Sequence, residues 1–531
     1  MAYEKPGVVV TQVQKSFSPS LVAPDLPAVL IGPAYWIVDS EGTGAMGYSY
    51  GTYTAGQAVT LSGLASTMKL DSTSVYVDLY MTSGVSSGNR LHLEYTNLSG
   101  LVDGGTSFTI PSSAASATWN GSQILVGYRA LNYNPDLIGN FITIESLNDI
   151  DTKFGANQVD VDNPLPFAIS LGLSNTATSL NAVAIAIDEF AGLTASGTLS
   201  SEHARAIDMI SSQEIYSMAP LTSDDTTIST YRSHAESLST PTEKRERLAF
   251  VNPKIPWGAD KATTSRNRRD QSLAIGLRRT FSTFPDTLFF KVTSWPVQKL
   301  KGSYVQALYA TTLTEYAILA KTYTTSAGIT YKVGTSITDA VYANLKADTT
   351  QYQYDAYIPV PGCFLAACIA GQVSGQFPEQ GHTNLPVAGP SLLKYSNDWF
   401  TESQLNTIAS GGNYIMTNVF GVVSSRHQLS TMMSTIQTRE LNITKSLDYT
   451  AKYLRNILSG FIGRSLITPA FLKVLGTIIS GLGLTLVKEG RLNGFKVTGV
   501  KQDTVSPDTV LVSIEVQPKY PVNYIRIDLI F

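Results

Sequence analysis

Apolar and polar side chains alternate along the segment 524–531. One face of this segment is apolar and consists of Ile525, Ile527, Leu529 and Phe531. This period of two residues predicts a half-buried strand. Because the segment is apolar to its last residue and has no local hairpin partner, we expect it to be held against a strand elsewhere.

A second isolated strand is predicted near the other end of the sequence. It follows Pro6-Gly7, and its apolar side chains are Val8, Val9, Val10 and Val13. Turn-forming residues flank it on both sides, so it must also pair with a remote strand. The next apolar run, 28–32, is continuous and predicts a buried strand.

Two helices are predicted at about 439–459 and 469–488. Thr468 is a good N-cap and Pro469 suits the first helical position. The second helix has one apolar stripe, formed by Leu472, Leu475, Ile479, Leu482 and Leu486. A strand at 510–516 follows.

Changes of pattern along the chain divide it into four parts. Residues 1–38 form an N-terminal arm and a first core strand. Residues 39–135 are rich in Gly, Ser, Thr and Tyr and predict an all-β domain. Strands and helices alternate in 136–395, which predicts an α/β domain with a β-rich part near 285–360. Residues 396–531 form a C-terminal domain, so the fold class is a multidomain α+β and α/β protein.

Composition narrows the classes of function. Of the 531 residues, 43% are hydrophobic and 15% are charged. The chain has 38 Lys and Arg and 41 Asp and Glu, which gives a net charge of -3. This predicts a globular protein with a weakly charged surface and argues against nucleic-acid binding. The basic residues between 261 and 279 are interpreted as a solvated helix face or as a patch that meets an acidic neighbour.

Three further features bear on compartment and redox state. The longest apolar run, of about 14 residues, is shorter than the ~20 that a membrane span needs, so no membrane insertion is predicted. The N-terminus has no signal-peptide pattern. Cys363 and Cys368 lie in an apolar run and are interpreted as buried reduced thiols.

Two enzyme motifs occur in the Gly-rich part and are rejected. Residues 42–47 match GxGxxG and residues 47–51 match GxSxG. Both mechanisms require a helix directly after the motif, whereas the residues that follow are β-prone. The five histidines are scattered, without the spacing of a metal site or a catalytic triad. We therefore predict no catalysis, no metal and no cofactor.

Several short segments occur in a characteristic order along the chain: PGVVV at 6–10, AVLIG at 28–32, FG at 154–155, NPL at 163–165, LNTIASGGNYI at 405–415, SSRHQLS at 424–430 and GRLNGF at 490–495. This order resembles that of the contractile tail sheath proteins of bacteriophages and related injection systems. One departure from the family pattern is Ser424-Ser425 in place of Trp-Gly, a local packing difference.

The resemblance implies a structural role. Sheath subunits form hexameric rings that stack helically around a tail tube, contact baseplate and tail terminator proteins, and exchange terminal strands with their neighbours. They store energy in an extended state and contract to drive the tube through the host envelope. The chain would then be part of the virion tail, assembled in the host cytoplasm.

The resemblance also assigns places to the predicted domains. The C-terminal domain and the N-terminal strand would form a conserved inner domain, and 39–135 an outer insertion. The second helix would lie near the tube, with candidate tube contacts Lys473, Lys488 and Arg491. The alternatives are a non-contractile virion shell protein and an α/β enzyme with a β accessory domain.

Overall fold

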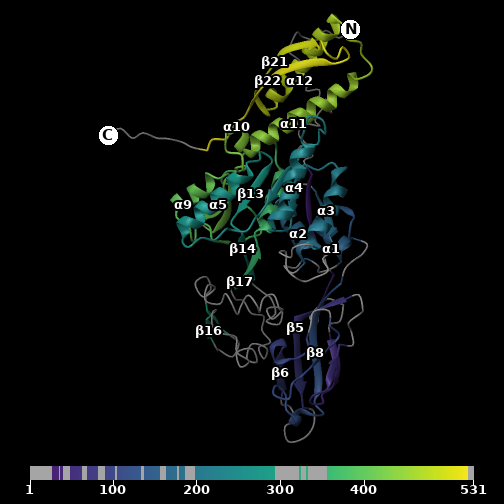
Figure 1. Cartoon of the computed structure of the whole chain (residues 1–531), viewed down its shortest axis with the longest axis vertical. Helices are drawn as coiled ribbons and strands as arrows, with labels where there is room; N and C mark the ends of the chain where they lie inside the picture. The colour runs from purple at the N-terminus through teal and green to yellow at the C-terminus, as the bar shows by residue number, and fades with distance from the viewer. Residues whose placement is uncertain are drawn as a thin grey trace, which may run out of the picture.

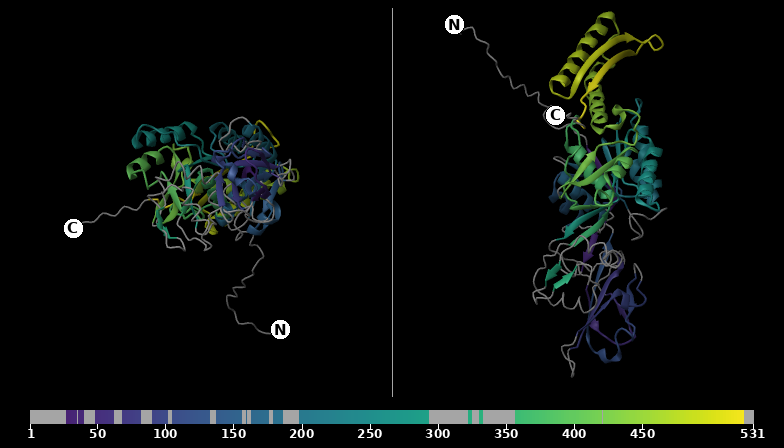
Figure 2. Two further views of the ribbon diagram at one scale, coloured as in Figure 1. Left: turned by 90° about the horizontal axis from the view of Figure 1, so that it is seen from below. Right: turned by 90° about the vertical axis from the view of Figure 1, so that its left-hand side faces the viewer.

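The computed structural model describes residues 27–34, 36–39, 48–61, 68–81, 90–101, 105–132, 137–155, 159, 163–175, 179–185, 198–292, 322–324, 330–332, 356–419 and 421–523. Three parts follow one another along the long axis (Figures 1 and 2). A helix-and-hairpin unit lies at one end, an α/β layer in the middle and an all-β domain at the other end. This confirms the predicted mixture of α/β and β-rich parts.

An eight-stranded, mostly parallel sheet forms the middle domain. Only its last pair at each end, β9–β10 and β19–β20, is antiparallel. The strands lie in the order β20 (Val422–His427), β19 (Asn413–Val419), β13 (Thr280–Phe284), β12 (Leu248–Val251), β11 (Ser217–Pro220), β1 (Ala28–Pro33), β10 (Leu180–Ile185) and β9 (Phe141–Ile144).

Strand β1 lies near the centre of this sheet because both of its faces are apolar. It pairs in parallel with β10 and β11. Ala28 and Leu30 pack into the core on one face, and Val29 and Ile31 into the core on the other. The sequence predicted an inner domain that β1 shares with residues 396–531; β1 lies in one sheet with β19 and β20 of that range, whereas β21 and β22 form a separate hairpin. A strand buried on both faces is typical of the interior of a parallel sheet.

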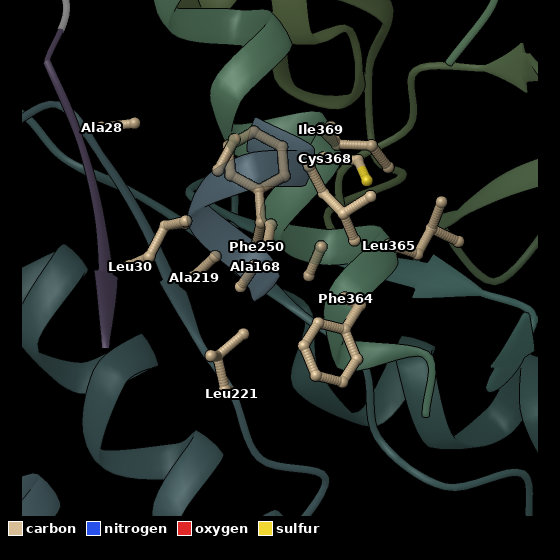
Figure 3. Close-up of a cluster of buried hydrophobic side chains, with 14 of the residues drawn as sticks. Ala28, Leu30, Ala168, Ala219, Leu221, Phe250, Phe364, Leu365, Cys368 and Ile369 are labelled. Atoms are coloured by element: carbon tan, nitrogen blue, oxygen red, sulfur yellow. The ribbon is translucent and has the colours of Figure 1, made fainter. Parts of the chain in front are cut away.

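Helices cover both faces of the sheet. One face is covered by α2 (Pro164–Asn175) and α8 (Cys363–Gly375), and the other by α3 (Thr198–Ser211) and α4 (Asp225–Leu238). Figure 3 shows Phe364, Leu365, Cys368 and Ile369 of α8 against side chains of the sheet and α2. Both cysteines are free thiols, and burial raises the pKa of each to about 12. This agrees with their interpretation as buried reduced thiols.

The edges of the middle domain carry smaller elements. Helix α1 (Leu147–Phe154) follows the edge strand β9. At the opposite edge, α5 (Lys261–Ile275) packs on α9 (Glu402–Ala409), which lies against β19. The remaining elements are the sheet β17 (Ala356–Pro361), β14 (Thr287–Val292) and β18 (Leu392–Lys394), and the pair β15 (Thr322–Thr324) and β16 (Thr330–Lys332).

The all-β domain has its own hydrophobic core, around Tyr53, Val77, Phe108 and Val126. Its main sheet contains β2 (Trp36–Asp39), β8 (Gln123–Asn132), β5 (Met68–Tyr80), β6 (Arg90–Glu94) and β3 (Tyr48–Thr52), and β4 (Ala58–Thr60) pairs with β7 (Ser107–Thr109). The described residues of 39–135 hold strands, turns and short 3-10 helices, and β2 starts before this range, at Trp36.

The C-terminal unit consists of α11 (Leu441–Leu458), α12 (Pro469–Lys488), β21 (Leu492–Gln502) and β22 (Val510–Pro518), and the short α10 (Ile436–Arg439) precedes it. The two helices and β22 confirm the sequence-based predictions, whereas β21 was missed. Because β19 and β20 belong to the middle sheet, this unit begins near α11 and not at residue 396.

Candidate assembly surfaces

A buried ion pair joins the C-terminal unit to the middle domain. Asp448 of α11 accepts two hydrogen bonds from Arg279 at the start of β13, each 2.8 Å long. The hydroxyl of Tyr216 donates to the same carboxylate at 3.0 Å. Burial lowers the pKa of Arg279, but the Asp448 hydrogen bonds and charge outweigh it and raise the pKa above its ordinary value. We call this contact between the C-terminal unit and the middle domain the joint; it is an ion pair largely shielded from water.

The basic residues of 261–279 do not form one solvated face. Arg268 is 1% exposed and donates to the carbonyls of Pro253 and Thr283, at 3.0 and 2.9 Å. Arg279 is 9% exposed. Only part of this group, including Lys261 and Arg266, lies at the surface. The prediction of a solvated face is wrong for the two buried arginines, because each finds a partner distant in sequence.

Helix α11 also docks on the end of α8 through a buried lysine. The Nζ of Lys445 donates to the carbonyls of Val373 and Phe377, each at 3.4 Å. Val373 lies in the last turn of α8, where unsatisfied carbonyls favour a cation. Burial lowers the pKa of Lys445 to about 7, and the charge of Glu379 partly opposes this shift. Protonation of Lys445 is therefore coupled to the packing of α11 on the end of α8.

Strands β21 and β22 form an antiparallel hairpin that no other described strand extends. Each strand therefore has one outer edge whose backbone N–H and C=O groups are not paired in a sheet within the described part of the chain. Exposed edges of this kind pair readily with a strand from another chain. The hairpin is the best-placed acceptor for an added strand in the C-terminal unit.

One face of the hairpin packs on α12. Leu475, Ile479 and Leu486 of α12 are buried. A Cβ at Gly483 would lie 1.8 Å from the Phe495 ring of β21, so this close approach requires glycine. Alternating apolar and polar positions in Phe495–Val500 were the signal for β21 that sequence reasoning overlooked.

The outer face of α12 is apolar and exposed. Val474 and Leu484 are each 55% exposed. By length and composition alone, α12 could cross a membrane: it has 20 residues, its most apolar 18-residue window has a mean hydropathy of 1.9, and 22% of that window is buried. The helix is longer than the run of about 14 residues identified in the sequence, because it begins at Pro469, continues through Lys473 and ends at Lys488.

The candidate tube contacts differ in their surroundings. Lys473 and Lys488, both on α12, are exposed. Arg491 is 6% exposed, pairs with Glu379 at 3.0 Å and lies over the Phe377 ring. Its burial makes it a structural contact between the hairpin and the middle domain, and this argues against its predicted role at the tube.

The base of the C-terminal segment is anchored on the middle domain. The side-chain amide of Asn523 lies 3.1 Å from Nε2 of His427 and 3.3 Å from the fully buried carboxylate of Glu440. The hydroxyl of Thr383 donates to the side-chain oxygen Oδ1 of Asn523 at 3.1 Å. The predicted strand residues Ile525, Ile527, Leu529 and Phe531 follow directly and lie outside the described residues, as do Val8, Val9, Val10 and Val13.

The described residues do not support the GxSxG motif or a metal site. Ser49 of the GxSxG match lies within strand β3, opposite Val126, and not on a strand-to-helix turn. Among the described residues no group of three or more His, Cys, Asp or Glu could hold a metal ion. The GxGxxG match at 42–47 lies outside the described residues.

Comparison with known proteins also finds similarity to a tail sheath protein. No family model matches the chain. A tail sheath protein of Mycobacterium phage Bxz1 is 26% identical over 169 residues, which are 31% of this chain and 28% of that relative's length.

Solved structures of sheath proteins align with this chain at low identity and with TM-scores below 0.5. The helical sheath of the anti-feeding prophage in its contracted state covers 75% of this chain and 90% of its own, at 13% identity and a TM-score of 0.46. A sheath tail protein of Desulfitobacterium hafniense covers 93% and 97%, at 9% identity and a TM-score of 0.39. The chain resembles tail sheath proteins, as the order of its sequence segments predicts.

Proposed function

We propose that this chain is the structural subunit of a contractile tail sheath and that it polymerises by exchanging terminal strands between copies. The observation that carries the proposal is the β21–β22 hairpin, whose outer edges no described strand occupies. Two strand-forming segments, 8–13 and 524–531, lack local partners in the sequence. A hairpin with open edges can accept a strand, and segments with a strand-forming sequence can supply one.

Backbone pairing suits a polymer that must survive rearrangement. An added strand is held by main-chain hydrogen bonds, while alternate side chains fill pockets on the acceptor. The anchor at Asn523 fixes where the C-terminal segment leaves the middle domain. A donor on one copy and an acceptor on the next make a heterologous contact, which generates rings or helices and not a closed dimer.

The assembly expected from the resemblance is a stack of hexameric rings around a tail tube, bounded by baseplate and tail terminator proteins. The extended lattice would store energy and contract to push the tube through the host envelope. The exposed Lys473 and Lys488 on the apolar helix α12 are proposed to face the tube. In this role the chain needs no cofactor and performs no catalysis, and its place is the virion tail.

The test is polymerisation of variants with an altered terminal strand. Deleting 524–531 is expected to abolish tubes or stacked rings in negative-stain images and to leave a folded subunit. Ile527→Asp disrupts the apolar face and should have the same effect, whereas Asp528→Asn, on the opposite face, is the matched control and should polymerise. Normal tubes from the truncated chain would refute strand exchange. A small monodisperse oligomer from the unaltered chain would refute the sheath role.

A further inference from the structure

The amino ends of the parallel strands meet at the end of the middle sheet on which α11 lies (Figure 1). Tyr216 directly precedes β11 and Arg279 directly precedes β13, and both contact Asp448 of α11. Pro27 directly precedes β1, and its carbonyl accepts a hydrogen bond from the backbone N–H of Tyr216 at 2.7 Å. The chain before β1 therefore reaches the sheet beside α11.

A cleft of about 340 Å³ lies between α11 and the middle domain at this point. Pro27, Ile215 and Tyr216 line it on the side of the middle domain, and Tyr449 lines it on α11. Ile462, which follows α11, also lines the cleft although 78% of it is exposed. The volume is at the lower end of the range of small-ligand pockets, so a few side chains can enter. We call this the α11 cleft.

The charged side chains at the rim of the α11 cleft are largely paired within the subunit. Arg455 forms an ion pair with Glu246, and Lys452 forms one with Glu214 at 3.3 Å. Asp448, which also lines the cleft, is held by Arg279 from outside it. We therefore expect apolar contact, and not an excess of charge, to select what binds in the cleft.

The segment that precedes Pro27 has a suitable sequence and lies outside the described residues. It reads Leu-Val-Ala-Pro-Asp-Leu at 21–26, with four apolar side chains besides the proline. Ala23 and Leu26 each precede a proline, which favours extended backbone. Six extended residues reach about 20 Å. Because the segment is joined to Pro27, a residue of the cleft lining, its effective concentration at the cleft is high.

We propose that residues 21–26 bind in the α11 cleft of their own chain and hold α11 against the middle domain. Their apolar side chains would cover Ile462. The one acid of the segment, Asp25, would lie near Lys244 and Arg245, which are the cations of the lining outside the two rim ion pairs.

This contact would fix the place where the proposed donor strand 8–13 leaves the subunit. Only that consequence rests on the proposed function, because the contact itself belongs to a single chain. It can therefore be tested on unassembled subunits, at a protein concentration below that at which they polymerise.

Disulfide formation tests where the segment lies. Val22→Cys combined with Ile462→Cys places one thiol in the segment and one in the cleft. Val22→Cys combined with Leu466→Cys is the matched control, because Leu466 is on the same loop, is 84% exposed and does not line the cleft. After mild oxidation, mass spectrometry should find at least about fivefold more disulfide within one chain for the cleft pair. Equal yields from the two pairs overturn the inference.

Mixing single variants tests whose segment occupies the cleft. Subunits with Val22→Cys are mixed with subunits that carry Ile462→Cys and are then oxidised. Binding within one chain predicts that disulfide-linked dimers stay as rare as in a mixture with Leu466→Cys. Abundant dimers in the first mixture alone overturn the inference in favour of a segment from a second copy.

Hydrogen exchange of the amides at 449–456 measures the effect on α11. Ile462→Ser should make them exchange about tenfold faster, because the proposed contact buries this side chain. Val22→Ser should have a similar effect, and both changes together should add little to either alone. Leu466→Ser is the control and should change exchange by less than about twofold. Unchanged exchange in Ile462→Ser overturns the inference, and exchange in the all-β domain checks that each variant is folded.

Val10→Ser combined with Val13→Ser separates this inference from the proposed function. Both residues belong to the proposed donor strand, so this variant should lose polymer and keep the α11 exchange of the unaltered chain. Faster α11 exchange in it would overturn the assignment to 21–26. If the cleft variants behave as expected and the unaltered chain forms no polymer, the contact stands and the proposed function fails. If Val22→Ser and Ile462→Ser leave α11 unchanged while the unaltered chain polymerises, the reverse holds.

Discussion

Asp448→Asn tests the joint between the C-terminal unit and the middle domain. The substitution keeps the shape of the side chain but removes the charge that compensates Arg279. The two side chains are 11% and 9% exposed, so the arginine is left largely desolvated. Removing one partner of a buried ion pair costs about 3–5 kcal/mol. We expect about 3 kcal/mol, because the amide oxygen of Asn can still accept one hydrogen bond.

Hydrogen exchange of the α11 amides, followed by mass spectrometry, measures this cost locally. A single unfolding transition is not expected for a chain with several domains, so a local opening free energy is the better quantity. A loss of about 3 kcal/mol corresponds to exchange faster by roughly two orders of magnitude. The effect should be concentrated in α11, with little change in the all-β domain.

Two further variants make the result interpretable. Lys452→Met removes an exposed ion pair on the same helix, whose partner Glu214 is 79% exposed, and should change exchange by less than about fivefold. Arg279→Met combined with Asp448→Asn removes both charges and should cost much less than the sum of the single changes. Unchanged α11 exchange in Asp448→Asn, or additive costs in the double variant, would refute the reasoning.

Three other outcomes are expected from the same region. Burial lowers the pKa of Lys445 to about 7 from an unfolded value of 10.5, so the unfolded chain binds more protons than the folded chain between these pH values. The stability of the α11 contact should therefore rise with pH from about 7 to 10, by on the order of 1 kcal/mol per pH unit. Lys445→Met should abolish this slope when hydrogen exchange is measured at several pH values. Gly483→Ala should destabilise α12 by about 1–3 kcal/mol because its Cβ would overlap Phe495, whereas Gly481→Ala, with open space around it, should stabilise the helix by up to about 1 kcal/mol. Equal hydrogen-exchange rates of the α12 amides in the two variants would contradict the close packing. Asn523→Ala removes the hydrogen bonds to His427 and Glu440 and should raise the critical concentration for polymerisation about tenfold. An unchanged critical concentration would show that this anchor is dispensable.

The sequence predicts those elements whose periodicity is strong. Helix α12 has a good cap at Thr468 and one apolar stripe, and its predicted bounds agree with the structure. The run 28–32 likewise predicts a buried strand. Its partners could not be predicted, because a continuous apolar run fits any position inside a sheet. The pairing of β1 with β10 and β11 in the middle of the chain was therefore not predicted.

The contacts that define the joint were not predictable from local patterns. Arg279 and Asp448 are 169 residues apart, and neither carries a sequence signal that distinguishes it from a surface charge. Arg268 lies on a helix with exposed neighbours, and only the carbonyl groups that surround it explain its burial. The aromatic cluster of Trp257, Tyr395 and Trp399 is also formed by residues that are distant in sequence.

The central claim is that 524–531 adds a strand to the β21–β22 hairpin of a neighbouring copy. A cryo-electron microscopy reconstruction of the assembled polymer, at a resolution that separates strands, tests it most directly. Strand exchange predicts continuous density from Asn523 of one copy to a strand paired with β21 or β22 of another. Density showing 524–531 folded onto its own chain, or a hairpin whose outer edges remain empty in the polymer, would contradict it.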